Sequence, residues 1–292
     1  MPFEKLLAHR TRQMSRSAIR EILKVTSQPG MTSLAGGIPA PASFPLDLIG
    51  DLSRQVIDKY ADRAFQYDLT EGFMPLRQAV ATHLAGRDIH VPGETVLITS
   101  GSQGVLDAAG KILISPGDTV GVESPTYLGA LQAFSPYEPR YTPIPCDHEG
   151  IIPEALAPLL AKGRMKFIYL VPTFQNPSGR TLPLDRRRAI AALIERYGTL
   201  LIEDDPYCDL RYEGHALPPI KSMAPEHVVY VGTLSKVLAP GLRIGFCVAP
   251  EPIRNWLVLV KQGVDLHTST FNQALACLLY TSDAADERGG VG

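Results

Sequence analysis

The sequence predicts an α/β fold with a mostly parallel central sheet and helices on both faces. Short apolar runs alternate along the chain with segments whose apolar residues follow helical spacing. Buried strands separated by helices in this way are typical of a parallel sheet that is covered on both sides. The chain has 292 residues, of which 45% are hydrophobic and 20% charged, enough for one large domain and a smaller piece.

The apolar runs place the expected strands. These are residues 95–99, 119–124, 166–172, 199–205, 228–235 and 243–250. Helical spacing follows at residues 105–114, 126–134 and 184–198. We divide the chain into an N-terminal helix and linker over 1–44, a large domain over 45–277 and a tail over 278–292. The Pro/Gly-rich segment 35–45 is interpreted as a linker or as a loop over a pocket.

Charge and cysteine content exclude several classes of protein. The chain has 28 basic and 30 acidic residues, a net charge of −2, and therefore no basic excess for nucleic acid or a membrane surface. No apolar stretch approaches the length of a membrane span. The four cysteines form no CxxC motif and are too few for a disulfide framework. We expect a cytoplasmic protein with no metal site, no nucleic-acid partner and no membrane partner.

The first twenty residues carry Arg10, Arg12, Arg16 and Arg20 but no apolar core of a secretory signal. An amphipathic first helix is the simpler interpretation. A mitochondrial presequence is the alternative.

Polar residues gather where the expected strands end. Ser100 to Gln103 follow one strand, Asn176 follows another, Asp204 ends a third and Lys236 lies just past a fourth. In open α/β sheets, ligands bind outside the carboxyl ends of the strands. Taken singly, a surface lysine, a common Gly/Ser turn or a capping aspartate would explain each residue. Their shared position predicts one site.

The chemistry of these residues predicts a particular ligand. The turn at 99–104 opens a helix whose free N–H groups suit a phosphate, and Ser235 and Arg243 add further donors. A carboxylate at the end of a buried strand requires a cationic partner, which a protonated ring nitrogen provides. Asn176 suits a ring oxygen, Tyr127 a ring face, and Lys236 an aldehyde. Pyridoxal 5′-phosphate (PLP) has all of these features.

The sequence also resembles a known family, the class I/II aminotransferases of PLP fold type I. Within it, the chain is most similar to the bacterial branch that holds 2-aminoadipate aminotransferases and the effector domains of GntR-type regulators. The matching segments occur in the expected order between residues 18 and 277: SLAGGIPAPASFP, QYDLTEGFMPLRQAV, ITSGSQGVLDA, VESPTYLGALQAF, VPTFQNPSGRTL, LIEDDPYCDLRYEG and GTLSKVLAPGLRIGF.

The resemblance implies a role for each site residue. Lys236 forms the Schiff base with PLP and moves a proton at the substrate's Cα, and Asp204, rather than Asp205, keeps the pyridine nitrogen protonated. Asn176 and Tyr207 bond the phenolic oxygen, and Tyr127 stacks on the ring. The phosphate is held by Ser102, Gln103, Thr233, Ser235 and Arg243. Tyr67 reaches the phosphate of a neighbouring subunit, which implies a homodimer, while Arg20, Gly37 and Asn176 contact the substrate.

The resemblance also sets expectations for the activity and for the end of the chain. We expect transfer of an amino group between an L-amino acid and a 2-oxo acid such as 2-oxoglutarate. The alternatives are a PLP-binding effector domain of a GntR-type regulator and an inactive fragment. The family pattern stops near residue 277, and the last segment resembles translated cloning sequence. A chain truncated there would bind PLP better than it transaminates, because the small C-terminal domain carries the arginine for the substrate's α-carboxylate.

Overall fold

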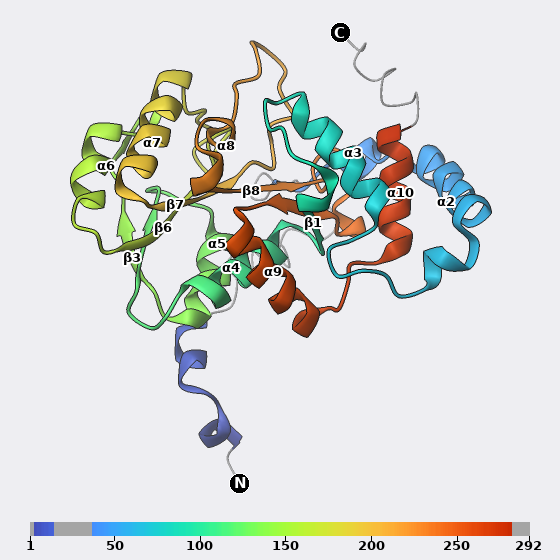
Figure 1. Cartoon of the computed structure of the whole chain (residues 1–292), viewed down its shortest axis with the longest axis horizontal. Coiled ribbons are helices and arrows are strands. Elements are labelled where there is room, and N and C mark those ends of the chain that lie inside the picture. The colour runs from blue at the N-terminus through green and yellow to red at the C-terminus, as the bar shows by residue number, and fades with distance from the viewer. Residues whose placement is uncertain (1–2, 15–36, 282–292) are drawn as a thin grey trace, which may run out of the picture.

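The computed structural model describes residues 3–14 and 37–281. Within this part of the chain, seven strands form one sheet in the order β1-β9-β8-β7-β6-β2-β3 (Figure 1). The strand pairs are parallel except for the two that contain β9, which runs antiparallel to β1 and to β8. The predicted α/β fold with a mostly parallel sheet is therefore confirmed. The strands are β1 (Val96–Thr99), β2 (Thr119–Val122), β3 (Arg140–Pro143), β6 (Met165–Leu170), β7 (Leu200–Asp204), β8 (Val228–Thr233) and β9 (Gly245–Val248).

Three short strands lie outside the predicted set. Strand β3 forms the sheet edge, and β4 (Cys146–Asp147) pairs with β5 (Gly150–Ile151) in a separate hairpin. None of the residues of β3 is fully buried. An edge strand of this kind lacks the apolar run by which central strands are recognised.

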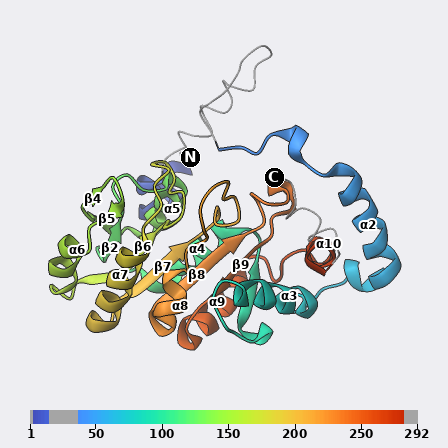
Figure 2. The same ribbon diagram turned by 90° about the horizontal axis from the view of Figure 1, so that it is seen from above.

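Two helical layers cover the sheet, as Figure 2 shows from above. Side chains alternate along β6, so that Phe167 and Tyr169 pack on one face while Ile168 and Leu170 pack on the other. The first face is covered by α4 (Ser102–Leu113), α5 (Leu128–Phe134) and α9 (Glu251–Val264), and the second by α6 (Pro153–Leu160), α7 (Leu184–Tyr197) and α8 (Ile220–Met223).

A third group of helices packs beside β1. It contains α2 (Leu46–Tyr60), α3 (Met74–Ala85) and α10 (Thr270–Thr281), which share a core with β1 and β9 (Figure 1). Helix α10 continues past residue 277, and Leu278 is buried in this core. The division of the chain at residues 44 and 277 stays a prediction.

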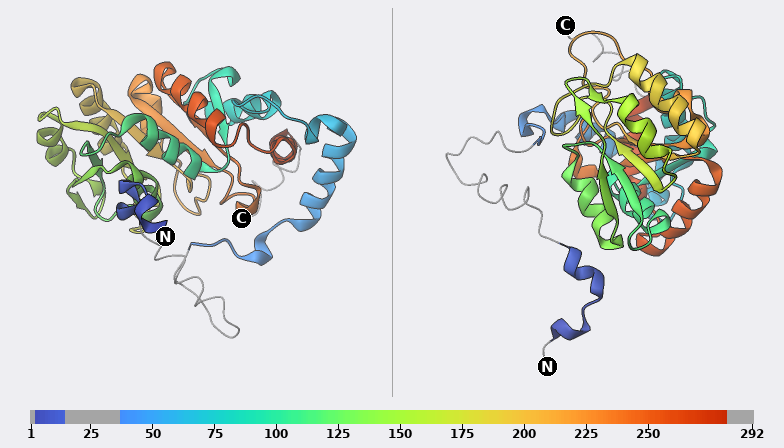
Figure 3. Two further views of the ribbon diagram at one scale, coloured as in Figure 1. Left: turned by 90° about the horizontal axis from the view of Figure 1, so that it is seen from below. Right: turned by 90° about the vertical axis from the view of Figure 1, so that its left-hand side faces the viewer.

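The N-terminal segment differs from the expected amphipathic helix in its described part. Residues 3–14 form two short 3₁₀ helices, Phe3–Leu6 and His9–Gln13. This segment lies beside the turn after α5, where the Nδ1 atom of His9 is 2.8 Å from Oε1 of Glu138 (Figure 3). Arg20 falls outside the described residues.

In the described ranges, no helix has both the length and the apolar character needed to cross a membrane.

Candidate active site

A cavity of about 530 Å³ opens at the carboxyl ends of the parallel strands. Most of the predicted site residues line it together. They are Gly37, Ser102, Gln103, Tyr127, Asn176, Asp204, Tyr207, Thr233, Ser235, Lys236 and Arg243. Tyr67 is not among the lining residues of the described chain, and its side chain is 77% exposed.

The topology explains this gathering. Strands β2, β6, β7 and β8 run in one direction, so the residues that follow them meet at one edge of the sheet. Strand β9 runs back from that edge, and the chain therefore places Lys236 and Arg243 in one loop between β8 and β9. Strand β1, on the far side of β9, brings Gly101 and Ser102 to the same edge.

The start of α4 forms a tight cradle for an anion. Gly101 has a φ of 83°, and a Cβ atom there would lie 2.2 Å from Nη2 of Arg243. A Cβ atom on Gly245 would lie 2.5 Å from the backbone N of Ser102. Only glycine permits both approaches. The guanidinium of Arg243 is thereby held against the first turn of a helix, where free N–H groups favour negative charge.

Hydroxyl and amide side chains complete this wall of the cavity. Thr233 Oγ1 donates to the carbonyl of Ile244 at 3.1 Å and lies 3.0 Å from Ser235 Oγ. Gln103 Nε2 donates to the carbonyl of Gly129 at 2.7 Å, which ties α4 to α5. Contact of Ser102, Gln103, Thr233 or Ser235 with a phosphate stays a prediction.

Asp204 lies at the end of β7 with only 3% of its surface exposed. Its Oδ2 atom accepts a hydrogen bond from Tyr169 at 2.7 Å, whereas its buried Oδ1 atom has no partner among the described residues. Burial raises the pKa of Asp204 to about 7. An unpartnered buried carboxylate oxygen beside a cavity fits a ligand that carries a protonated nitrogen.

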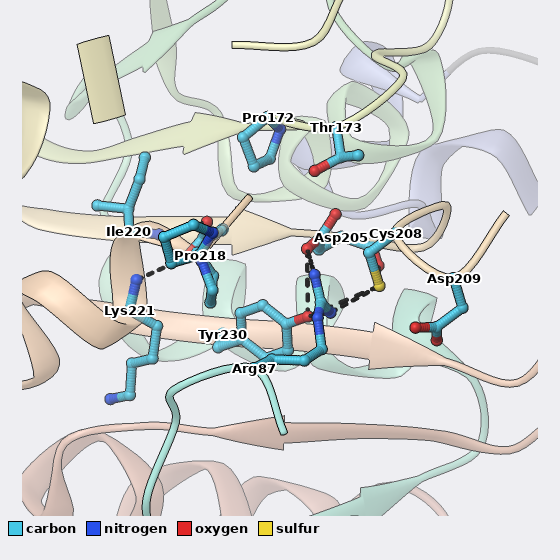
Figure 4. Close-up of polar contacts among 12 residues, drawn as sticks. Arg87, Pro172, Thr173, Asp205, Cys208, Asp209, Pro218, Ile220, Lys221 and Tyr230 are labelled. Atoms are coloured by element: carbon cyan, nitrogen blue, oxygen red, sulfur yellow. Dashed lines mark hydrogen bonds and ion pairs between the residues drawn. The ribbon is translucent and has the colours of Figure 1, made fainter. Parts of the chain in front are cut away.

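Asp205 does not line this cavity and belongs to a separate buried cluster with Arg87, Cys208 and Tyr230 (Figure 4). Its Oδ2 atom is 2.8 Å from Nη2 of Arg87 and accepts a hydrogen bond from Tyr230 at 3.2 Å. Arg87 also contacts the Tyr230 hydroxyl and the Cys208 thiol. Asp205 is thus the partner of a buried cation. The side chains of Asp204 and Asp205 therefore have different surroundings, as alternation along a strand predicts.

Lys236 is half-buried at the mouth of the cavity. Its Nζ atom donates to the carbonyl of Gly37 at 2.9 Å and lies 5.9 Å from the centre of the Tyr207 ring. Burial lowers the pKa of Lys236, because the charged amine loses hydration. A lysine with a lowered pKa is more often neutral and is therefore a better nucleophile.

Three further side chains face the same space. Asn176 Nδ2 donates to Tyr207 Oη at 3.1 Å. Tyr127 precedes the first residue of α5. Burial raises the pKa of both tyrosines, so they remain neutral donors at ordinary pH.

Sequence reasoning missed Tyr169 and Arg87, neither of which lines the cavity. Tyr169 belongs to a continuous apolar run and gives no polar signal. Arg87 lies in the turn after α3, 118 residues from Asp205. Strand alternation marks the faces of β6 and β7, but the register between the two strands is needed to pair Tyr169 with Asp204.

Within residues 3–14 and 37–281, no group of three or more His, Cys, Asp or Glu side chains is arranged to hold a metal ion.

Comparison with known proteins gives a consistent family. The chain is 44% identical to aromatic-amino-acid aminotransferase 1 of Thermococcus litoralis over 94% of its own length and 68% of that protein. A transcriptional regulator of Bacillus subtilis, described as HTH-type and uncharacterised, is 33% identical over 92% of the chain and 55% of the regulator. The chain spans about two thirds of the length of the aromatic-amino-acid aminotransferase and of two other curated aminotransferases that it matches.

A solved structure indicates the same family. The alpha-aminoadipate aminotransferase of Thermus thermophilus, complexed with N-(5′-phosphopyridoxyl)-L-leucine, matches with a TM-score of 0.91 and 37% identity, over 99% of this chain and 73% of that one. The family model for aminotransferase class I and II matches residues 52–287. With its fold, its cavity and these matches, the chain belongs to the class I and II aminotransferase family.

Proposed function

We propose that this chain binds PLP in the 530 Å³ cavity and is the cofactor-binding part of an aminotransferase. The reaction moves an amino group between an L-amino acid and a 2-oxo acid such as 2-oxoglutarate. One observation carries the proposal: Lys236 and Asp204, whose Oδ1 atom has no partner among the described residues, border the same cavity as Ser102 and Arg243 of the anion cradle.

The residues present fit the three polar ends of the cofactor. The cradle of α4 and Arg243 suits the phosphate, Asp204 suits the ring nitrogen, and Lys236 suits the aldehyde. When bound, PLP supplies an aldehyde for amines and a ring that withdraws electrons from the substrate's Cα. In this assignment Tyr127 stacks on the ring, and Asn176 and Tyr207 bond its phenolic oxygen.

The protein's own groups then have separate tasks. Asp204 holds a proton at the ring nitrogen, because its free oxygen is buried and requires a donor. Lys236 moves a proton at the substrate's Cα, for which a lowered pKa is suitable. Ser102, Gln103, Thr233, Ser235 and Arg243 fix the phosphate, which orients the ring.

The proposal extends to the amino donor. Arg20 matches a substrate-facing arginine of the 2-aminoadipate branch, and Gly37 lines the cavity beside Lys236. We therefore propose an acidic or long-chain amino acid, such as 2-aminoadipate or glutamate. If Arg20 has this role, Arg20→Ala should lower the kcat/KM ratio of glutamate to leucine. An unchanged ratio would remove Arg20 from the substrate site.

The decisive experiment is borohydride reduction of the PLP-loaded protein followed by peptide mapping. We expect a phosphopyridoxyl group on Lys236 and its loss in Lys236→Ala. Modification of another lysine in the wild-type protein would refute the assignment. A half-reaction with an amino acid then separates an aminotransferase from a regulator domain that binds PLP without turnover.

A further inference from the structure

We propose that Tyr169 is a positioning residue for Asp204, which leaves one carboxylate oxygen free for the cofactor. The inference rests on the proposed function, since that function gives the free oxygen its partner. Tyr169 lies on β6, has no exposed surface and donates its hydroxyl to Oδ2 of Asp204 at 2.7 Å.

The hydrogen bond makes the two oxygens of Asp204 unequal. Oδ2 has a fixed donor, whereas Oδ1 is buried and has no partner among the described residues. A carboxylate without that bond would be free to turn about its Cβ–Cγ bond. With it, the carboxylate plane is held and Oδ1 remains the open acceptor in the cavity wall.

The position of Tyr169 is itself fixed by its surroundings. Strand β6 lies between β2 and β7, and Tyr169 stands opposite Ile202 in the register of β6 with β7. Asp204 follows two residues after Ile202 and so points to the same face of the sheet. The ring of Phe134 packs edge-on against Tyr169 at 5.9 Å between centroids. The phenol hydroxyl therefore has little freedom to move.

Tyr169 also opposes the effect of burial on Asp204. Other titratable groups that interact with Asp204 are Asp205 on the same chain segment, Tyr127 before α5 and Tyr207 after β7. Burial, and to a lesser degree Asp205, raise the pKa of Asp204, and the bond from Tyr169 lowers it. Loss of the hydroxyl should therefore favour the protonated carboxyl, which no longer offers a negative charge to a protonated ring nitrogen.

The fold provides a matched control in Tyr230. It lies on β8, the neighbour of β7 on the other side, and 1% of its surface is exposed. Its hydroxyl donates to Asp205 at 3.2 Å. Tyr169→Phe and Tyr230→Phe thus each remove one buried hydroxyl from one of two adjacent aspartates.

The test begins with the full chain free of cofactor. Carbon-13 NMR of labelled aspartate carboxyls gives the titration midpoint of Asp204, assigned by its loss in Asp204→Asn. We expect Tyr169→Phe to raise this midpoint by about one unit and to weaken PLP binding by roughly 10- to 100-fold. Tyr230→Phe should leave both quantities near their wild-type values.

An unchanged midpoint in Tyr169→Phe, or an equal shift in Tyr230→Phe, would overturn the proposal. If Tyr169→Phe does not fold, 3-fluorotyrosine at position 169 preserves the ring and gives a more acidic, stronger donor. The midpoint should then fall, and a rise or no change would count against the role. Failure of the wild-type chain to bind PLP would contradict the proposed function, but the cofactor-free midpoint would still decide the role of Tyr169.

Discussion

At the residue scale, the two adjacent aspartates after β7 have opposite environments. Asp204 lines the cavity, and its Oδ1 atom has no partner among the described residues, while Asp205 is paired with Arg87 and Tyr230. One aspartate is thus available to a ligand, and the other neutralises a buried cation. The same substitution at the two positions should therefore give different results.

We predict that Asp204→Asn loses PLP affinity and turnover by orders of magnitude without loss of stability. Asp205→Asn leaves the buried Arg87 without its anion and should lower the free energy of unfolding by about 3 kcal/mol. Chemical denaturation and a PLP titration of both variants check this. Equal losses of PLP affinity in the two would contradict the assignment.

The pH dependence of stability gives a second readout of Asp204. Its pKa in the folded chain is about 7, above the ordinary value of 3.8, so the folded state retains a proton that the unfolded state releases. The stability that this proton provides is complete below pH 4 and is lost as the pH rises through 7. Asp204→Asn should remove this part of the pH dependence in the cofactor-free protein.

The prediction of Asp204 in place of Asp205 rests on the family resemblance and on alternation along one strand, which is independent of the neighbouring strands. The sequence did not predict Tyr169, because a tyrosine within a buried strand carries no sign of its partner. It did not predict Arg87 either, because the turn after α3 meets β7 only in the folded chain. The strand ends and the family resemblance together indicated the residues that line the cavity, and tertiary register determines those that support them.

At the scale of elements, the anion cradle depends on a glycine that allows close contact. Gly101 combines a φ of 83° with a position at which a Cβ atom would lie 2.2 Å from Nη2 of Arg243. Gly117 has a similar φ of 87°, but a Cβ atom there would meet nothing within 4 Å. Alanine substitutions at the two glycines therefore separate the effect of backbone strain from the effect of steric contact with Arg243.

We predict that Gly101→Ala and Gly117→Ala both lose about 1–2 kcal/mol of stability, since alanine is strained at positive φ. Only Gly101→Ala should also lose PLP affinity, because the methyl group displaces Arg243. Thermal unfolding and PLP titration measure the two effects. Unchanged PLP affinity in Gly101→Ala would show that the cradle does not hold the phosphate.

Strands were predicted correctly where helices cover both faces of the sheet, because such strands are continuous apolar runs in the sequence. All the predicted strands occur, with ends that differ by a few residues. Strand β3 was missed because it is short and only partly buried, and the β4–β5 hairpin was missed because each of its strands has two residues. Arginines every few residues suggested a first helix, but in residues 3–14 the chain forms 3₁₀ turns that bury no side chain in a core.

At the scale of the whole molecule, exposed apolar residues surround Tyr67 in the sequence, the residue expected to reach a neighbouring subunit. Phe65, Tyr67 and Leu69 are 70%, 77% and 59% exposed, although Ala64 beside them is buried. Side chains of this type in one short segment favour contact with another protein surface. We propose a homodimer in which Tyr67 of each subunit completes the phosphate site of the other.

Mixed dimers test this arrangement. Lys236→Ala and Tyr67→Phe should each reduce activity, the first by orders of magnitude. If Tyr67 acts across the interface, dissociation and reassociation of the two variants together should restore activity, because one site of each mixed dimer is intact. Activity no greater than the average of the separate variants would place Tyr67 in its own subunit's site.

The reversed strand β9 has a consequence for biosynthesis. During translation, β1 emerges before the other strands of the sheet, but its partner β9 emerges only after β8. Strands β8 and β9 are close in sequence and can pair by closing a short loop. Lys236 and Arg243 are therefore expected to approach each other early in folding. Strand β1, in contrast, has an unpaired edge until β9 has been synthesised. Pulsed hydrogen exchange during refolding should show the amides of β8 and β9 protected before those of β1. Nascent chains that end before β9 should bind chaperones through the unpaired strand β1.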